Sequence, residues 1–171
     1  MRDTRLDAVY SSDLLRALQT ARMIVRHRGY EIHEDQRLRE WDLGVLVGLC
    51  RTQAEHDQPY AARIRRDYLV DKPIPGGESI RQRYKRVIEA VEEIAAHHQG
   101  ERILVVSHGG PLGDCYRRAL GKDIRERMRI DLRNATVNQV LIDGNDWSLV
   151  FWAWTDHLTD IGSRPNWGGY R

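Results

Sequence analysis

The stretch of sequence that decides the predicted fold is Ile103-Leu104-Val105-Val106-Ser107-His108-Gly109-Gly110-Pro111-Leu112. Four apolar, mostly β-branched residues before a histidine, two glycines and a proline indicate a buried parallel strand that turns abruptly into a helix. His108 then lies at the carboxyl end of the strand, where open α/β sheets bind ligands, beside a helix N-terminus that favours anions. We expect His108 to face an anion, above all a phosphoryl group. The alternative is that the glycines only make a turn, which the histidine caps.

The composition indicates one ordinary globular domain. The chain has 171 residues, 41% of them hydrophobic and 30% charged, and its net charge of +2 is too balanced to indicate a nucleic-acid or membrane partner. No apolar run approaches the roughly 18 residues of a membrane span, and the first residues lack the apolar core of a signal peptide. Cys50 and Cys115 form no CxxC pair. A reducing compartment is therefore the default, and we expect a cytoplasmic protein.

A second strand-to-helix junction is predicted near the start of the chain. Residues 6–10 indicate a strand, Ser11-Ser12-Asp13 has helix-start chemistry, and residues 14–25 carry apolar side chains on one helical face. Arg16 lies in the first turn of this helix, where its guanidinium can reach past the strand end to a phosphate or carboxylate. A solvated helix arginine is the alternative.

Residues 30–48 are expected to be irregular, and they contain the acidic residues Glu40 and Asp42. A carboxyl group beside a phosphate could donate a proton to a leaving alkoxide, because repulsion by the dianion favours its protonated form. Surface ion pairing is the alternative for both residues. Residues 51–75 are interpreted as a lid or insertion over a site.

The second half of the chain has clearer patterns. Ser79 and Gln82 form a capping-box sequence before an amphipathic helix that ends near Gly100. Residues 136–142 and 147–154 indicate two strands joined by a tight turn, on one edge of the sheet. An irregular tail is expected over residues 160–171.

Three other chemistries find no sequence support. The seven histidines and two cysteines are not spaced for a tetrahedral zinc site, and no metal or cofactor is expected. The sequence has no Gly-x-Ser-x-Gly nucleophile elbow, no Gly-x-Gly-x-x-Gly and no Walker A motif. The sequence therefore gives no support to a zinc enzyme, a serine hydrolase of this type or a nucleotide-dependent enzyme.

Four segments in order resemble the histidine phosphatase superfamily, the phosphoglycerate-mutase-like proteins. They are residues 10–21, Leu38-Arg39-Glu40 with Gly44 and Gly48, Pro75-Gly76-Gly77-Glu78-Ser79, and Val106-Ser107-His108-Gly109-Gly110. The resemblance covers residues 6–157. It implies a three-layer α/β/α fold with a mostly parallel sheet, in which a histidine attacks a phosphate monoester and forms a phosphohistidine.

Motif matching assigns the site residues that the resemblance implies. Arg16 would be a phosphate ligand and Glu40 the proton donor to the leaving oxygen. His108 would be a second histidine, binding phosphoryl oxygens together with Gly109. The substrate would be a small phosphorylated metabolite, such as a phosphoglycerate, a sugar phosphate, a nucleotide monophosphate or a cofactor precursor.

The sequence departs from the family pattern at the nucleophile. The family's Arg-His-Gly signature ends a first strand upstream of the Ser-Ser segment, and this chain begins a few residues before that segment. We therefore expect a single domain over residues 1–171 that is N-terminally incomplete, lacking its first strand and helix. Arg26-His27-Arg28-Gly29 is not a substitute, because His27 lies eleven residues beyond Arg16, or about 16 Å along a continued helix. The gap would leave open strand edges, which the sheet closes or a second copy covers in a homodimer.

The leading hypothesis is a phosphomonoester hydrolase that acts through a phosphohistidine in the intact protein. The segment between Gly48 and Gly76 looks shorter than the insertion of the mutases proper, which favours hydrolysis over phosphoglycerate mutase-type transfer. A second hypothesis is a non-catalytic phosphate-ester binding or assembly protein on the same fold. A purely structural role predicts no affinity for phosphate.

Overall fold

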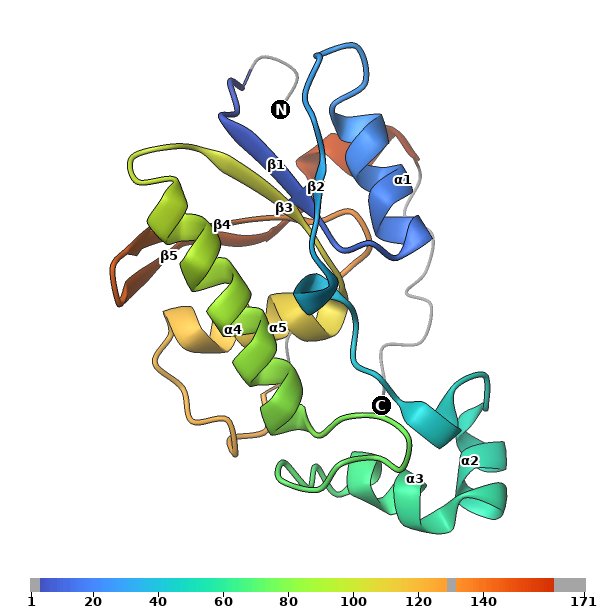
Figure 1. The fold of residues 1–171 in the computed structure, drawn as a ribbon. Helices are drawn as coiled ribbons and strands as arrows, with labels where there is room; N and C mark the ends of the chain where they lie inside the picture. Colours follow the sequence, from blue (N-terminus) through green and yellow to red (C-terminus); the bar gives the residue numbers. More distant parts are fainter. Residues whose placement is uncertain (1–3, 129–131, 162–171) are drawn as a thin grey trace.

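The computed structural model describes residues 4–128 and 132–161, which form two β-sheets with helices packed around them (Figure 1). Strands β1 (Ala8–Ser11), β2 (His33–Glu34) and β3 (Ile103–Val106) make a parallel sheet in the order β2-β1-β3. Strands β4 (Val137–Asp143) and β5 (Asp146–Trp154) make an antiparallel hairpin. The prediction of an α/β fold with a mostly parallel sheet is confirmed. The helices are α1 (Leu15–Ile24), α2 (Arg51–Asp57), α3 (Pro59–Arg66), α4 (Ile80–His97) and α5 (Gly109–Ala119), and the 3-10 turns are η1 (Gln36–Leu38), η2 (Gly44–Leu46) and η3 (Asp156–Ile161).

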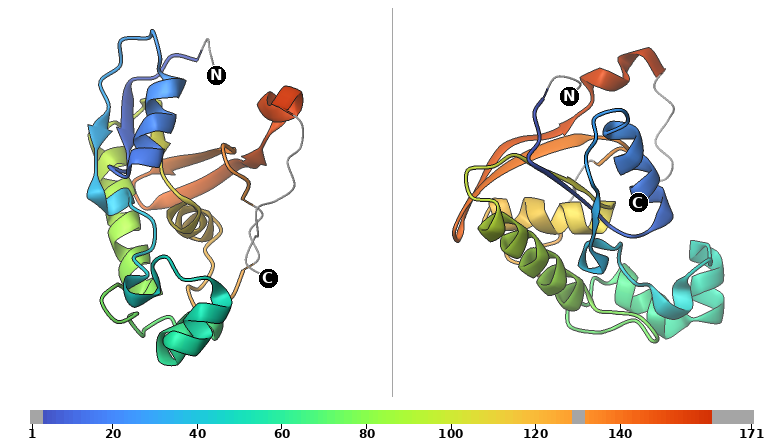
Figure 2. Two further views of the ribbon diagram at one scale, coloured as in Figure 1. Left: turned by 90° about the vertical axis from the view of Figure 1, so that its right-hand side faces the viewer. Right: turned by 45° about the horizontal axis from the view of Figure 1, so that its top comes forward.

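Alternating side chains of β3 join the layers on its two faces. Leu104 and Val106 pack against Ala17 and Ala21 of α1. Ile103 and Val105, on the opposite face, pack against the core formed by α4 and the hairpin. Because successive side chains of a strand point to opposite faces, a continuous apolar strand needs cover on both sides. Figure 1 shows α1 on one side of the parallel sheet and α4 on the other, and Figure 2 shows the hairpin extending beyond β3.

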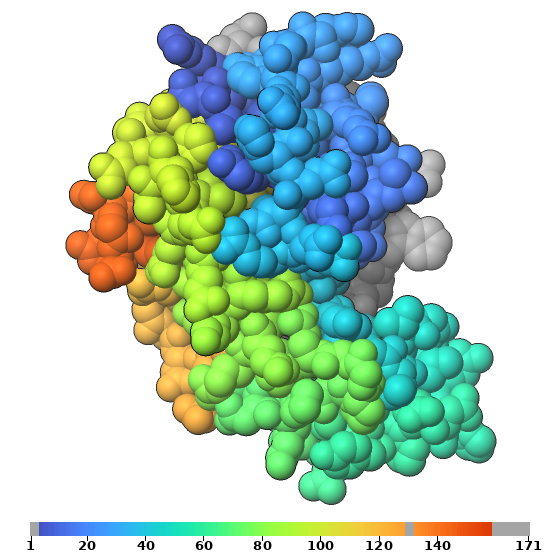
Figure 3. All heavy atoms as spheres, in the orientation of Figure 1, coloured from blue at the N-terminus to red at the C-terminus, as the bar shows by residue number. Residues whose placement is uncertain are grey.

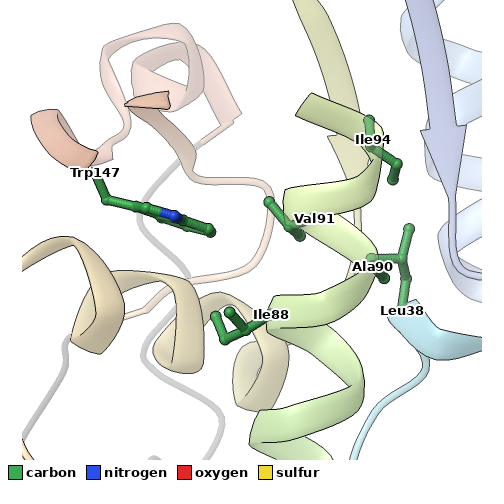
Figure 4. Packing of buried hydrophobic residues seen from close by; sticks show 6 residues of the cluster. All are labelled: Leu38, Ile88, Ala90, Val91, Ile94 and Trp147. Atoms are coloured by element: carbon green, nitrogen blue, oxygen red, sulfur yellow. The ribbon is translucent and has the colours of Figure 1, made fainter. Parts of the chain in front are cut away.

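Helix α4 anchors the larger part of the core. Its predicted capping box is confirmed: Ser79 Oγ accepts from the N–H of Gln82 at 3.1 Å, and Gln82 Oε1 accepts from the N–H of Ser79 at 2.8 Å. The apolar face of α4 packs against Leu38 on one side and Trp147 of β5 on the other (Figure 4). This packing holds the segment around Leu38, which precedes Glu40, against the end of the sheet.

Two features of the sheet differ from the prediction. The short strand β2 lies in a segment expected to be irregular, and the hairpin expected at an edge of the sheet forms a sheet of its own. Within residues 4–128 and 132–161, β3 pairs only with β1, and the hairpin reaches the core through side chains such as Trp147. Strand pairing depends on which edges meet in space, which a local pattern does not determine.

The remaining predictions agree with the structure to different degrees. Strand β1 begins two residues later than expected, and α1 begins after Leu14, whose N–H donates to Ser12 Oγ at 3.3 Å. The segment 51–75 contains α2 and α3, which project beyond the rest of the molecule at the lower right of Figure 3. Its role as a lid stays a prediction, and the expected irregular tail lies, beyond Ile161, outside the described residues. No described helix is long and apolar enough to cross a membrane.

Candidate functional site

The candidate site lies where β1 and β3 end side by side. The two strands are parallel, and their register pairs Ala8 with Ile103 at one end and Ser11 with Val106 at the other. Both segments therefore leave the sheet at the same edge. The N–H of Ser12 donates to Val106 O at 2.9 Å just beyond the last pair. This register brings the two predicted strand-to-helix junctions together.

His108 is the centre of the site and connects both junctions. It is buried, with 8% of its surface exposed, and stands at the N-cap position of α5. Arg16 Nε donates to His108 Nδ1 at 3.2 Å, and His108 Nε2 lies 2.8 Å from Ser12 Oγ. A guanidinium is always a donor, so Nδ1 accepts and the proton of the neutral ring sits on Nε2, which donates to Ser12.

The electrostatics of the site favour the neutral ring. Burial, followed by the nearby Arg16 cation, lowers the pKa of His108 below its usual value. Arg16 itself is exposed at the start of α1, and Gly109 is exposed at the start of α5. An oxyanion at this edge could therefore meet a fixed cation, an imidazole N–H and the N-terminus of α5.

Glu40 lies against the first turn of α5, as a half-buried side chain. Its Oε1 and Oε2 accept from the N–H of Gly110 at 3.1 and 3.2 Å, and Oε1 also accepts from the N–H of Trp41 at 2.8 Å. A Cβ added at Gly110 would overlap Glu40 Oε1. An alanine at the second glycine of the His-Gly-Gly turn would therefore displace the Glu40 carboxylate.

The loop that carries Glu40 is fixed by a residue that the sequence analysis did not identify. Arg86 of α4 donates to the carbonyl oxygens of Arg37, Arg39 and Glu40 at 2.7 to 3.0 Å, and it binds both carboxylate oxygens of Glu78. Ser107 Oγ also donates to Leu38 O at 2.8 Å. An arginine on an amphipathic helix has no sequence signal that separates this role from an exposed one.

The other acidic candidate, Asp42, does not join Glu40. It is exposed, and its Oδ1 accepts from the N–H of Gly44 at 2.9 Å, which caps a turn. Gly44 has φ +46° and packs so closely against residues 75–77 that a Cβ there would overlap Pro75 O. A Cβ at Gly77 of the third motif would likewise overlap Asp42 O, so Gly44 and Gly77 permit the close backbone contact between the two loops.

Other ion pairs of the described residues do not include His108. Arg39 binds Asp13, the residue after Ser12, and its hydrogen bonds lower the pKa of Asp13. Arg63 and Arg66 of the predicted lid donate to Asp67 and are largely exposed. These ion pairs are surface interactions of small expected energy.

The described residues bring an arginine, a histidine and a carboxylate to one edge of the sheet, and they place no second histidine beside them. In the described ranges, none of the other six histidines hydrogen-bonds to Arg16, Ser12 or Glu40. His27 lies in the turn after α1 with φ +65°, three residues beyond the end of that helix. Within the same ranges, no three His, Cys, Asp or Glu side chains converge in a way that could hold a metal ion.

Comparison with known proteins gives consistent results. The family model of the histidine phosphatase superfamily (branch 1) matches residues 1–155. Phosphoglycerate mutase-like protein 4 of Arabidopsis thaliana is 36% identical over 174 residues, covering 99% of this chain and 74% of the relative. The metal-independent phosphoserine phosphatase of the same plant is 37% identical over 163 residues, covering 94% of this chain and 67% of the relative. Among solved structures, YhfR of Bacillus stearothermophilus superposes with a TM-score of 0.79 at 26% identity, covering 91% of this chain and 78% of that one.

Proposed function

The chain belongs to the histidine phosphatase superfamily, and from that premise we propose that it is the core of a phosphomonoester hydrolase acting on a small phosphorylated metabolite. The proposal includes a phosphohistidine intermediate in the intact protein. The single observation that carries it is the contact between Arg16, His108 and Ser12 at one sheet edge, with Glu40 held beside it on α5. Relatives named as a phosphoserine phosphatase and as a phosphoglycerate mutase-like protein also support phosphate-ester chemistry.

The proposed roles follow from the chemistry of each group. The Arg16 guanidinium and the Nε2–H of His108 bind oxygens of the substrate phosphate, with Gly109 beside them at the N-terminus of α5. A histidine of the intact protein attacks phosphorus, the P–O bond to the alcohol breaks, and protonated Glu40 gives its proton to the leaving oxygen. Water then attacks phosphorus and gives a proton to the Glu40 carboxylate, the P–N bond breaks, and inorganic phosphate leaves, so that the free histidine and protonated Glu40 are restored.

The attacking histidine is the part of the proposal that the described residues do not supply. His108 carries its proton on Nε2, and the lone pair on Nδ1 accepts from Arg16, so neither ring nitrogen has a free lone pair with which to attack phosphorus, although the Nε2–H can pass from Ser12 to a phosphate oxygen. The proposal assigns the nucleophile to an Arg-His-Gly segment on a strand upstream of the sequence given. It follows that this chain alone should retain phosphate affinity and lack rapid turnover.

Two alternatives remain, and each makes a different prediction. Phosphoglycerate mutase-type transfer predicts that the phosphoryl group passes to a second phosphoglycerate position in preference to water. A non-catalytic phosphate-ester binding or assembly protein predicts affinity without turnover in every form of the chain. The relative named as a phosphoserine phosphatase supports hydrolysis, the one named as a phosphoglycerate mutase-like protein supports transfer, and the reaction products decide between them.

The test combines binding and turnover. Inorganic phosphate binding to this chain should be measured by isothermal titration calorimetry, beside Arg16→Met and the exposed-surface control Arg22→Met on the same helix. Loss of one charge-assisted contact, worth about 1.5–3 kcal/mol, should weaken binding about 10- to 150-fold in Arg16→Met only. Hydrolysis of an aryl phosphate should appear when an upstream Arg-His-Gly strand is added. Equal phosphate affinity in Arg16→Met, or no turnover in the extended form, would contradict the proposal.

The cytoplasmic location and the homodimer that covers the incomplete sheet stay predictions. The location rests on the cysteines, and Cys50 and Cys115 are both free thiols. Sedimentation of the chain at several concentrations would test the homodimer.

A further inference from the structure

We propose that Arg83, held by Asp114, is a positioning residue that places the Glu40 carboxylate on the first turn of α5. Arg83 is absent from the four motifs and acts on the site through Glu40. The proposal rests on the proposed function in one respect, because it matters for catalysis only if Glu40 is the proton donor.

Arg83 is a buried cation with a fixed orientation. Only 8% of its surface is exposed, and Asp114 is 2% exposed. Arg83 Nε donates to Asp114 Oδ2 at 2.7 Å and Nη2 donates to Oδ1 at 2.9 Å, a two-bond contact between α4 and α5. Burial alone would lower the pKa of Arg83, but the bonds to Asp114 raise it, so the guanidinium stays charged.

The third nitrogen of the guanidinium faces the site. A Cβ placed on Gly110 would lie 3.2 Å from Arg83 Nη1 and would overlap Glu40 Oε1. The cation and the carboxylate therefore converge on the same glycine, whose N–H donates to Glu40. The positive charge beside this carboxylate favours its place on the helix start.

Arg83 also contacts the residue that follows Glu40. Its guanidinium carbon lies 5.2 Å from the centroid of the Trp41 ring, within range of a cation–π interaction. The N–H of Trp41 is the other donor to Glu40 Oε1, and the Trp41 indole N–H donates to Glu78 O at 2.9 Å. Arg83 thus touches both segments whose N–H groups fix Glu40.

The competing explanation is that the Arg83–Asp114 pair only joins α4 to α5. Replacing both residues together distinguishes this structural role from the positioning of Glu40. Arg83→Met with Asp114→Leu keeps apolar volume between the helices and removes both charges, which proteins often tolerate. Arg83→Gln with Asp114→Asn is a second neutral pair that keeps hydrogen-bonding groups. Arg81→Met is the matched control, because Arg81 lies on the same helix and pairs with Asp71 on an exposed face.

The test reads the Gly110 amide in a ¹H–¹⁵N spectrum, which needs no turnover. Loss of the carboxylate acceptor in Glu40→Gln should move the Gly110 proton upfield. Either neutral pair should move it to the same side, while Arg81→Met leaves it unchanged. A wild-type Gly110 position in a folded neutral pair would overturn the proposal, as would a Gly110 signal that Glu40→Gln does not move.

In a form that hydrolyses phosphate esters, the leaving group provides the second readout. Glu40→Gln should reduce kcat on an alkyl phosphate about 10²- to 10⁴-fold and much less on p-nitrophenyl phosphate, whose leaving group needs no proton. The neutral pair should lose about 10²-fold on the alkyl phosphate with the same selectivity, because displacement of a catalytic group by ~1 Å has that cost. Equal losses on both substrates in the neutral pair would refute positioning. Equal losses in Glu40→Gln would instead refute the proposed proton donor.

Discussion

Removal of Arg83 alone should destabilise the fold severely, because it leaves the Asp114 carboxylate buried without its partner. The side chains are 10% and 3% exposed, and two hydrogen bonds join them. Breaking a buried pair of this kind costs about 3–5 kcal/mol. For a chain of this size about 1 kcal/mol corresponds to 2–4 °C, so Arg83→Met should lower Tm by about 6–20 °C.

The assay is thermal and urea unfolding followed by far-UV circular dichroism at pH 7, with three variants beside the wild type. Arg83→Met/Asp114→Leu should recover the wild-type Tm, because neither charge remains in the interior. Arg81→Met removes an arginine charge from the exposed face of α4, and its Tm should equal that of the wild type. Equal Tm values for Arg83→Met and Arg81→Met would refute the reasoning, as would a double variant as unstable as Arg83→Met.

Acidification supplies an independent check of the same explanation. Burial raises the pKa of Asp114 even with Arg83 present, and the loss of Arg83 removes the group that opposes this shift. In the folded Arg83→Met variant, Asp114 should therefore become protonated at a higher pH than it does in the unfolded chain. Its stability relative to the wild type should increase as pH falls through that range. A pH-independent difference would show that lost packing, and not an unpaired charge, destabilises the variant.

Three further predictions concern the site. Burial lowers the pKa of His108, so as pH falls below about 6.5 the histidine of the unfolded chain is protonated before that of the folded chain. The Tm of the wild type should therefore fall more steeply with decreasing pH than the Tm of His108→Gln. Equal slopes of Tm against pH would contradict this. Gly110→Ala should lower Tm because its Cβ would overlap Glu40 Oε1. Gly109→Ala should not lower Tm, because its Cβ would lie 3.8 Å from Glu40 Oε2. A rise in Tm for both variants would show that Glu40 moves away from Gly110 without cost. Arg86→Met should accelerate amide hydrogen exchange in the loop that carries Glu40, and unchanged exchange would count against its role there.

Local pattern was sufficient for the elements that build the site edge. The apolar run 103–106, the turn at His108 and the capping box at Ser79 each lie within about ten residues, and each forms as predicted. The family resemblance assigns Arg16 and His108 to the same phosphate, and the structure places the two side chains in contact. The sequence thus supports the fold class and the meeting of these two residues.

Other assignments failed because the deciding partner is distant in the chain. Ser12 has the chemistry of a helix cap, yet its hydroxyl bonds to His108, 96 residues away. Asp42 and Glu40 have the same local character, but only Glu40 reaches Gly110, 70 residues away. The local propensity of such a residue is the same whether it bonds to a neighbour or to a residue far away in the chain. The sequence pattern therefore could not show which partner it has.

What the sequence by itself determined is the two strand-to-helix junctions, the helix after Ser79, the two strands of the hairpin and the family resemblance. Only the tertiary structure decided that Arg83 and Arg86 face inward from α4, that β4 and β5 form a separate sheet, and that Glu40 rests on α5. The physical reason is that hydrophobic periodicity shows which face of a helix is apolar. Whether a charged side chain is buried depends instead on a partner such as Asp114, which the packing of α4 on α5 brings into contact across 31 residues of sequence.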